Sequence, residues 1–545
     1  MNFISKILYT ASLLTLPFFA LAQSDKDEKP KDNWQNLDLK DDGVFGISTE
    51  KAYKELLKGK KSTPVIVAII DGGIDEEHED LKKIMWVNTK EIPGNGVDDD
   101  KNGYVDDING WNFIGSAKAN VHHDNMELIR LINKFQPKYA SALNSTPFNE
   151  KERKEFQLYQ KLVTDYMAKL QSAQMGLQNT TMIKKYLDEI TSSMNNDNPS
   201  LDDLNSYKPS NDMQSQVIKF IKSELKKDDF MKFYKELLDG IKYYDAEVKY
   251  HLNVDFDPRK DSVGDDYSNS NERIYGNNDI TGPDAEHGTH VAGIVSAIRT
   301  NDIGIKGVAN SVKIMGVRTV PDGDERDKDV ANAIRYAVDN GAKILNMSFG
   351  KAYAWDKKVV DEAVKYAVSK GVLLVHAAGN DSKNTEKEDN FPTRLFTDST
   401  GVNMGTAEGW IEVGATGWTN DEDLVATFSN FGGKTVDVFA PGVKINSTMP
   451  GSTYKENDGT SMAAPVVSGL AALIWSHYPQ FTALQVKDII MNSVTKVEQK
   501  VKIKEEGDNK RVLLSEISVS GGVVNAYNAL LLAEKTNSTA NVKSK

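Results

Sequence analysis

Five continuous apolar runs, separated by amphipathic stretches, constrain the fold of this 545-residue chain more than any other feature. The runs are VIVAII (65–70), VKIMGV (312–317), AKILNMS (342–348), VLLVHAA (372–378) and TVDVFA (435–440). Runs without polar alternation indicate strands buried on both faces. Residues 287–298, 328–340 and 356–370 instead carry apolar residues at helical spacing. Alternating strands and helices predict an α/β fold with a doubly wound parallel sheet.

Charged, helix-favouring sequence at residues 122–252 interrupts this alternation. Its apolar residues are spaced three and four apart and predict a helix seam, made of Phe156, Tyr159, Val163, Tyr166, Leu170, Ala173 and Leu177. The seam indicates either ordinary helix packing or a coiled coil with a partner. Ser200, with Asp203 three residues later, predicts the start of another helix. We therefore expect residues 122–252 to form a large inserted α-helical subdomain.

The first 22 residues have the composition of a signal peptide. Lys6 precedes an apolar run at residues 7–19, and small residues end at Ala22. A membrane anchor is the alternative, but the run is short for a bilayer span and acidic sequence follows it. We expect an exported protein, secreted or held in the periplasm or cell envelope, with no membrane span after cleavage. Residues 23–42 form a charged, irregular leader in this interpretation.

The amino-acid composition limits which binding partners are expected. The chain has no cysteine, so export does not bring disulfides. Its 79 acidic and 66 basic residues give a net charge of −13, which argues against nucleic acid or an anionic membrane as a partner. The oligomeric state is left open.

Three residues stand where a parallel sheet presents chemistry. Asp71 follows the run VIVAII, His287 opens a helix in EHGTHVAGI, and Ser461 opens another in DGTSMAAP. Strand carboxyl ends and the helix starts after them share one edge of such a sheet. Singly, these residues are also explained as a turn aspartate, a helix cap and an N-cap serine. Together they supply a nucleophile, a general base and a group that orients the base.

Five motifs carry a resemblance to a known family. DGGID, HGTHVAG, ILNMSFG, AAGN and GTSMAAP, in this order, resemble the subtilisin family of serine endopeptidases, the subtilases. The resemblance implies a sheet of subtilisin type, with a catalytic domain at residues 43–121 and 253–535 and a polar tail at 536–545. It also implies that the chain hydrolyses protein or peptide substrates.

The resemblance assigns roles to single residues. Ser461 attacks the peptide carbonyl, His287 transfers the proton and Asp71 orients the imidazole. Asn380 and the backbone N–H of Ser461 stabilise the oxyanion. The expected substrate-binding residues are Ser348, Phe349 and Gly350 at an edge segment and Ala377, Ala378 and Gly379 at the side-chain pocket.

Further charged residues and two histidines bear on substrate preference and on metal binding. The acidic loop of Asp322, Asp324, Glu325 and Asp327 is either solvated surface charge or the source of a mild preference for basic substrate residues. His290 and His376 are interpreted as packing residues rather than metal ligands. No organic cofactor is expected.

One loop predicts a structural calcium site. VDDDKNGYVDD places oxygen ligands at alternate positions around Gly103, and the predicted ligands are Asp98, Asp100, Asn102 and Asp106. Asn109 stands where a calcium loop closes with glutamate, and a plain polar turn is the alternative. Calcium would stabilise a chain without disulfides by binding the folded state.

The chain departs from the family at three points. Gly72 follows Asp71 where relatives carry serine or threonine, and the leader leaves no room for an inhibitory prodomain. The insertion is the third departure, and we hypothesise that it forms a lid or a substrate-selecting wall. The leading interpretation is a secreted serine endopeptidase. The alternatives are a narrow-specificity processing protease and a catalytically silent binding protein on the same fold.

Overall fold

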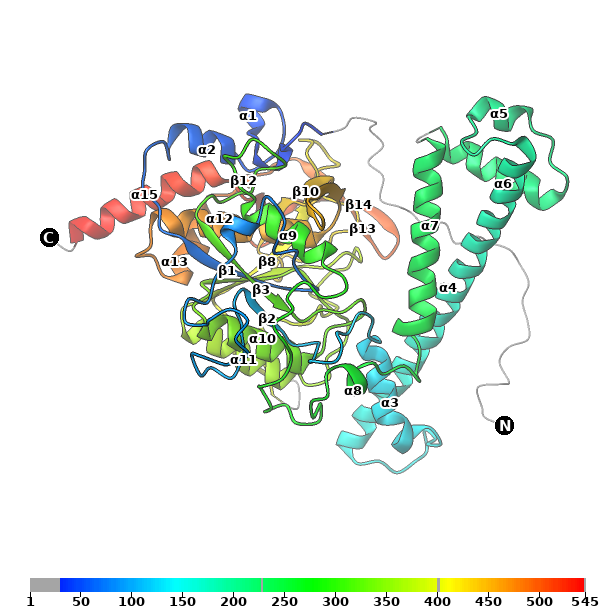
Figure 1. Cartoon of the computed structure of the whole chain (residues 1–545), viewed down its shortest axis with the longest axis horizontal. Coiled ribbons are helices and arrows are strands. Elements are labelled where there is room, and N and C mark those ends of the chain that lie inside the picture. The colour runs from blue at the N-terminus through cyan, green and yellow to red at the C-terminus, as the bar shows by residue number, and fades with distance from the viewer. Residues whose placement is uncertain (1–29, 227–228, 399–401, 544–545) are drawn as a thin grey trace.

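The computed structural model describes residues 30–226, 229–398 and 402–543 (Figure 1). A nine-stranded sheet has the order β12-β15-β9-β8-β5-β4-β1-β3-β2. Its strands are β1 (Val65–Asp71), β2 (Gly110–Asn112), β3 (Val312–Arg318), β4 (Ile344–Met347), β5 (Leu373–Ala377), β8 (Trp410–Thr416), β9 (Val438–Pro441), β12 (Thr495–Lys496) and β15 (Gly522–Val523). All neighbours are parallel except β12 and β15. The predicted parallel α/β sheet is confirmed, and β8 is a central strand that the prediction omitted.

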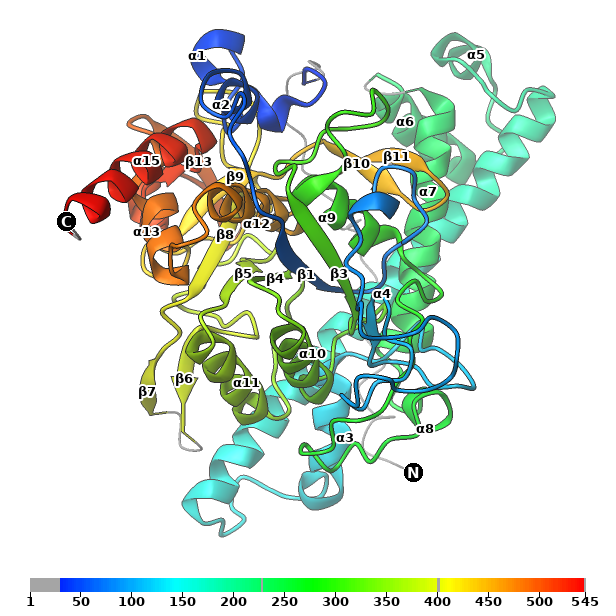
Figure 2. The same cartoon turned by 60° about the vertical axis from the view of Figure 1, so that its left-hand side comes forward.

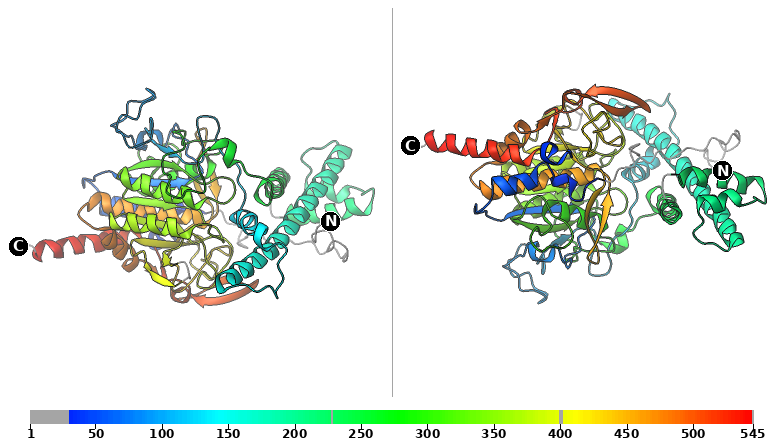
Figure 3. Two further views of the ribbon diagram at one scale, coloured as in Figure 1. Left: turned by 90° about the horizontal axis from the view of Figure 1, so that it is seen from below. Right: turned by 90° about the horizontal axis from the view of Figure 1, so that it is seen from above.

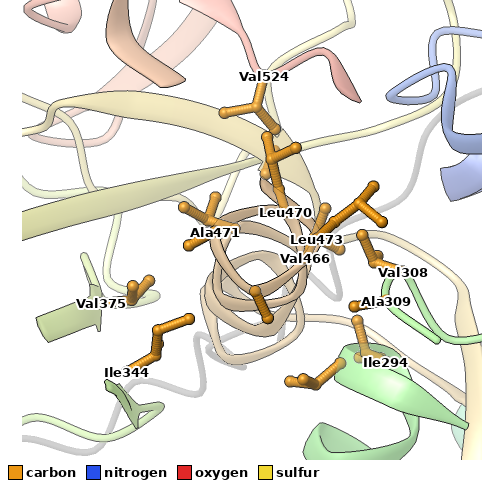
Figure 4. Close-up of a cluster of buried hydrophobic side chains, with 14 of the residues drawn as sticks. Ile294, Val308, Ala309, Ile344, Val375, Val466, Leu470, Ala471, Leu473 and Val524 are labelled. Atoms are coloured by element: carbon orange, nitrogen blue, oxygen red, sulfur yellow. The ribbon is translucent and has the colours of Figure 1, made fainter. Parts of the chain in front are cut away.

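Helices cover both faces of the sheet (Figures 2 and 3). One face packs against α2 (Thr49–Glu55), α9 (Glu286–Ser296), α12 (Thr460–His477), α13 (Ala483–Asn492) and α15 (Ala526–Lys543). The other packs against α10 (Asp327–Asp339) and α11 (Lys357–Ser369). Because α12 is apolar all round, it lies in the middle of its layer. Figure 4 shows Val466 and Leu470 of α12 among Ile344 of β4, Val375 of β5 and Ile294 of α9.

Smaller elements complete this domain. They are the hairpins β6 (Leu395–Thr397) with β7 (Asn403–Thr406), β10 (Ile445–Met449) with β11 (Thr453–Asn457) and β13 (Lys500–Glu505) with β14 (Asp508–Leu513), and the short helices α1 (Leu39–Asp42), α8 (Arg259–Ser262) and α14 (Leu514–Ile517). Within the described ranges, no helix is both long and apolar enough to span a bilayer.

One terminal expectation is wrong. The leader is not irregular from Trp34 onward, because that side chain is buried edge-on against Trp418, and Asn36 Nδ2 donates to the Lys306 carbonyl at 2.9 Å. The predicted polar tail begins within α15, which continues to Lys543. The predicted signal peptide lies outside the described residues.

The insertion is helical, as predicted. It comprises α3 (Glu127–Tyr139), α4 (Glu150–Met194), α5 (Leu201–Ser206), α6 (Asp212–Glu224), α7 (Phe230–Ala246) and the π-helical turn η4 (Glu247–His251). Figures 1 and 2 show α4 and α7 as an antiparallel arm that projects from the sheet domain, with α5 and α6 at its far end. We call α4 to α7 the arm, and α3 with η4 the insertion root.

The predicted seam packs inside the protein. Its residues lie on α4, where Phe156 and Ala173 are buried and the others pack around α3 and α7. Gly176 permits the closest contact, since a Cβ there would lie 2.3 Å from the Tyr244 ring of α7. The interpretation as ordinary helix packing is therefore the right one. Ser200 also caps α5 in a capping box with Asp203, as expected.

Candidate active site

One ring nitrogen of His287 contacts both carboxylate oxygens of Asp71. His287 Nδ1 lies 2.8 Å from Oδ1 and 3.0 Å from Oδ2 of Asp71. Asp71 ends β1 and is 3% exposed, whereas His287 lies in the first turn of α9 with 45% of its side chain exposed. A carboxylate on Nδ1 fixes the imidazole tautomer and leaves Nε2 as the proton acceptor.

Electrostatics make this imidazole a stronger base. Burial disfavours the charged imidazolium, but the attraction and hydrogen bond of Asp71, helped by Asp284, outweigh it. The pKa of His287 is therefore raised above its usual value.

A glycine in HGTHVAG allows α9 to approach β1 this closely. A Cβ at Gly288 would lie 2.2 Å from the Gly73 carbonyl oxygen and 3.1 Å from Asp71 Cβ. Any side chain at residue 288 would push the helix, and with it His287, away from the carboxylate. The motif glycine is thus a packing requirement of the pair.

A buried arginine supports the peptide after Asp71. Gly72 N donates to Asp71 Oδ1 at 2.7 Å, and the Gly72 carbonyl accepts from Arg318 Nε at 2.7 Å. Arg318 is 2% exposed, and burial lowers its pKa to about 10. The sequence analysis missed Arg318, although a charged residue at the end of the run VKIMGV is an available signal. Gly72 therefore lacks the family's hydroxyl, but its peptide is hydrogen-bonded on both sides.

Ser461 is the second residue of α12, and the motif around it explains its setting. Pro465 has no N–H to donate to the Ser461 carbonyl four residues earlier, so that carbonyl accepts from Ser348 Oγ at 2.9 Å. Ser461 Oγ donates in turn to the Ser348 carbonyl at 3.1 Å. No hydrogen bond between Ser461 and His287 occurs among the described residues. Such bonds often form only when substrate binds.

Two residues that the sequence analysis missed hold Ser348 in place. Asn346 Nδ2 donates to Ser348 Oγ at 2.9 Å, and Ser468 Oγ donates to Asn346 Oδ1 at 2.8 Å. Asn346 and Ser468 are fully buried, so their polar groups have no alternative partner in water. The chain of bonds connects β4 to the start of α12 beneath Ser461.

Asn380 lies beside the same helix start, and its amide orientation is fixed. The backbone N–H and the Oγ1 hydroxyl of Thr460 both donate to Asn380 Oδ1 at 2.9 Å. Because a backbone N–H can only donate, the acceptor must be the amide oxygen, which leaves Nδ2 as a donor. Asn380 is exposed and Ser461 half-buried, so both are accessible to a substrate.

The two predicted substrate-binding segments lie at neighbouring strand ends. Residues 348–350 follow β4, and Ala377 ends β5, its parallel neighbour, with residues 378–379 directly after it. The side chains of Ser348 and Phe349 are buried, and so are those of Ala377 and Ala378. Their substrate-binding roles stay predictions.

Both predicted explanations of the acidic loop are wrong for three of its carboxylates, because the insertion root covers them. Asp324 Oδ2 accepts from the Glu127 N–H at 2.8 Å, and Asp327 Oδ1 lies 2.6 Å from Lys351 Nζ. Glu325 is 2% exposed, and burial raises its pKa. Asp324 therefore contacts the root, Asp327 contacts Lys351 of the catalytic domain, and of the four carboxylates only Asp322 is exposed.

The root also reaches the predicted substrate-binding edge segment, residues 348–350. Lys351 directly follows Gly350, and its Nζ lies 2.6 Å from Glu127 Oε2 of α3. Arg130 Nε donates to Glu127 Oε1 at 3.1 Å. Burial would raise the pKa of Glu127, but Arg130 and Lys351 outweigh it and hold the pKa at about 2. A helix of the insertion thus fixes the residue next to the edge segment.

The predicted calcium ligands separate in the structure. Asp98 and Asp100 gather with Glu91, which the sequence analysis missed, and their ligand atoms lie within 4.8 Å of one another. Asp106 instead accepts from the N–H groups of Gly94, Asn95 and Gly96. Asn102 donates to Asp107 at 3.1 Å and accepts from Tyr104 N at 2.8 Å. Asp106 and Asn102 therefore lie apart from the group of Glu91, Asp98 and Asp100, and the calcium site stays a prediction.

His290 and His376 are buried packing residues, as interpreted. His290 Nε2 lies 2.9 Å from the Lys455 carbonyl, and burial lowers the His290 pKa to about 4. His376 Nδ1 lies 2.9 Å from Glu412 Oε1.

Comparison with known proteins adds an independent finding. The model of the Subtilase family matches residues 62–511. The chain is 41% identical over 191 residues to a thermophilic serine proteinase of a Bacillus species, covering 35% of this chain and 42% of that protein. It is 37% identical over 215 residues to Subtilisin E of Bacillus subtilis, covering 39% of this chain and 51% of the relative. The chain thus spans about half the length of these curated relatives.

Two further similarities have different coverage. The chain is 35% identical over 210 residues to Subtilisin BL of Lederbergia lenta, covering 38% of this chain and 70% of the relative. A solved protease structure from Pseudoalteromonas arctica is 28% identical, with a TM-score of 0.37, and the match covers 46% of this chain and 74% of that one.

Proposed function

The chain belongs to the subtilase family, and from this premise we propose that it is a serine endopeptidase that cleaves peptide bonds through an acyl-enzyme on Ser461. The observation that carries the proposal is the buried Asp71 carboxylate on His287 Nδ1. Ser461 lies in the first turn of α12 and Asn380 beside that turn, and α12 packs against α9 and β1, which carry His287 and Asp71. A binding protein has no need of these four side chains together.

Each residue has a defined step. Ser461 Oγ attacks the scissile carbonyl carbon while His287 Nε2 takes the hydroxyl proton, and Asp71 stabilises the imidazolium. The carbonyl oxygen becomes an oxyanion that accepts from Asn380 Nδ2 and from the Ser461 N–H, which has no intrahelical partner at a helix start. The imidazolium then protonates the leaving amine. Water deacylates the ester through the same base.

Labelling with a fluorophosphonate tests the nucleophile directly. The purified protein should be labelled once, at Ser461, and Ser461→Ala should not be labelled. Asp71→Asn should fold and lower turnover by about 10⁴-fold, because the imidazole loses its tautomer control. A folded, unlabelled parent protein would refute the proposal and favour a binding role.

Export is a second part of the proposal. It is supported by the lysine, apolar run and small residues within positions 1–22. N-terminal sequencing of protein from the native host should begin at Gln23. A mature chain that still begins at Met1 would contradict export by cleavage.

We further propose that the insertion acts as a fixed wall of the substrate cleft. It is supported by the ion pair between Glu127 of the root and Lys351 beside the edge segment. The arm offers a sharp deletion, because α4 and α7 run side by side where a Cβ at Gly240 would lie 3.9 Å from Thr180 Cγ2. Joining residue 180 to residue 240 with a short glycine linker removes the far end of the arm and keeps the root.

This deletion separates the arm from the root. If the arm restricts the substrates, the shortened enzyme should cleave a peptide library more broadly while keeping its turnover on short peptides. A cleavage profile identical to that of the full chain would contradict a role for the arm. The full insertion should not be deleted, because its removal leaves Lys351 buried without Glu127.

A further inference from the structure

A second group of metal-ligating side chains lies where the insertion root meets the catalytic domain. One ligand atom each from His122, His123 and Asp322 lies within 4.8 Å of the other two. The backbone fixes their spacing, since Asp322 N donates to the His122 carbonyl at 2.8 Å and Asp124 N donates to the Asp322 carbonyl at 2.9 Å. The group therefore belongs to a hydrogen-bonded segment and not to loose surface loops.

Two imidazole nitrogens lie against one carboxylate. His123 Nδ1 lies 2.7 Å from Asp322 Oδ2, and His251 Nε2 lies 3.1 Å from Asp322 Oδ1. Both nitrogens are buried away from water, and the Asp322 carboxylate is the group that each of them faces. A zinc ion would replace these nitrogen–carboxylate contacts, because the ligands of one ion also lie close together, roughly 3.3 Å apart in a tetrahedral site.

Aromatic packing holds the rings in position. The His123 ring is stacked between His122, at 4.0 Å between centroids, and Tyr250, at 4.1 Å and an interplanar angle of 10°. On the other side, His251 Nδ1 lies 3.2 Å from Glu247 Oε1. A carboxylate on the second nitrogen is the usual partner of a metal-bound histidine.

We propose that His122, His123 and Asp322 bind a zinc ion, with His251 of η4 as a fourth ligand. Two or three imidazoles and one carboxylate form a typical zinc set, whereas calcium requires oxygen ligands. The ion would join the insertion root to the loop after β3. Thr319 and Val320 of that loop donate their N–H groups to the Asp71 carbonyl at 2.8 and 3.1 Å.

The site therefore couples the insertion to the triad. Bound zinc fixes His251 of the root and Asp322 of the loop to the same ion, so the root cannot leave the catalytic domain without breaking a metal–ligand bond. This coupling does not depend on proteolytic activity. It can be measured on a protein without its nucleophile.

The test uses the full mature chain without a polyhistidine tag, as Ser461→Ala to prevent autolysis. After treatment with a chelator, titration calorimetry with zinc chloride near neutral pH should show one ion per chain. His123→Ala should weaken zinc binding at least about tenfold. His477→Ala, at the other end of α12, is the matched control and should bind like the parent.

A second variant and a second signal guard against misfolding. His122 is exposed, so His122→Gln should keep the fold by circular dichroism and still weaken binding. Cobalt should give visible ligand-field bands in the parent that the His122→Gln and His123→Ala variants lose, and excess calcium should not remove them. The proposal would be overturned if the parent showed no saturable zinc binding, or if both variants bound zinc with the affinity of the parent. Asp322 would then be an ordinary ion-pair partner of the root.

Discussion

Glu127→Gln is the sharpest perturbation of the contact between the insertion and the substrate edge. The substitution keeps the size of the side chain but removes a fully buried charge that faces Lys351 and Arg130. The Glu127 pKa falls from 4.5 to about 2 despite burial, which corresponds to about 3 kcal/mol of stabilisation of the folded state. Breaking a buried pair by removing one partner costs a similar 3–5 kcal/mol.

Urea unfolding in the Ser461→Ala background measures this cost. We expect Glu127→Gln and Lys351→Met each to lower the free energy of unfolding by about 3 kcal/mol, and the double variant to lose less than the sum. The control is Glu150→Gln, because Glu150 pairs with Lys154 where both side chains are mostly exposed. That change should cost less than about 0.5 kcal/mol. A loss below about 1 kcal/mol for Glu127→Gln, or additive single losses, would refute the reasoning.

The pH dependence of the same pair has a definite sign. A carboxyl group whose pKa is depressed in the folded state contributes stability that is present above its unfolded pKa, which is 4.5 for Glu127. That contribution is lost as the pH falls toward the folded value of about 2. The difference in stability between the parent and Glu127→Gln should therefore shrink between about pH 5 and 2.

Three further predictions concern the active site and the calcium loop. Asn380→Ala should lower kcat by about 100- to 1,000-fold with little change in KM, because Nδ2 donates to the oxyanion of the transition state and not to the bound substrate. An effect confined to KM would contradict this role. Because neutral His287 is the base and its pKa is raised, kcat/KM should increase with pH through a midpoint above about 6.5, and a lower midpoint would contradict the pairing with Asp71. If calcium binds Asp98 and Asp100, a chelator should lower the Tm of the parent by a few degrees but not that of Asp98→Asn; equal shifts would exclude these residues as ligands.

The apolar runs could predict the strands because every one of them is buried on both faces. VIVAII and VKIMGV became the paired strands β1 and β3, and Asp71 appeared at the predicted strand end. The strand WIEVGAT was missed because Glu412 and Thr416 interrupt its apolar character, although Glu412 is 8% exposed and accepts from the Trp410 indole at 2.7 Å. A buried polar residue with a partner looks the same in sequence as a solvated one.

Residues of the site could not be predicted from the sequence where their hydrogen-bond partners are distant along the chain. The triad could be assigned because each member lies in a local motif with a specific backbone requirement. Arg318 and Asn346 could not, because their partners Gly72 and Ser468 come from other segments. The acidic loop failed for the same reason: charge in sequence does not reveal that α3 will bury it.

The charges at the insertion root determine how the insertion can act. A lid that opened at the root would have to break the buried pair of Glu127 with Lys351 and, just before α3, that of Asp124 with Arg326, whose atoms lie 2.6 and 2.7 Å apart. Separating these pairs would hydrate the carboxylates, but Lys351 and Arg326 belong to the catalytic domain and would lose their buried partners. Each cation that stayed buried would then be only partly compensated, since Asp327 remains beside Lys351 and Asp257 beside Arg326. The pairs therefore favour movement of the arm beyond the root over opening at the root.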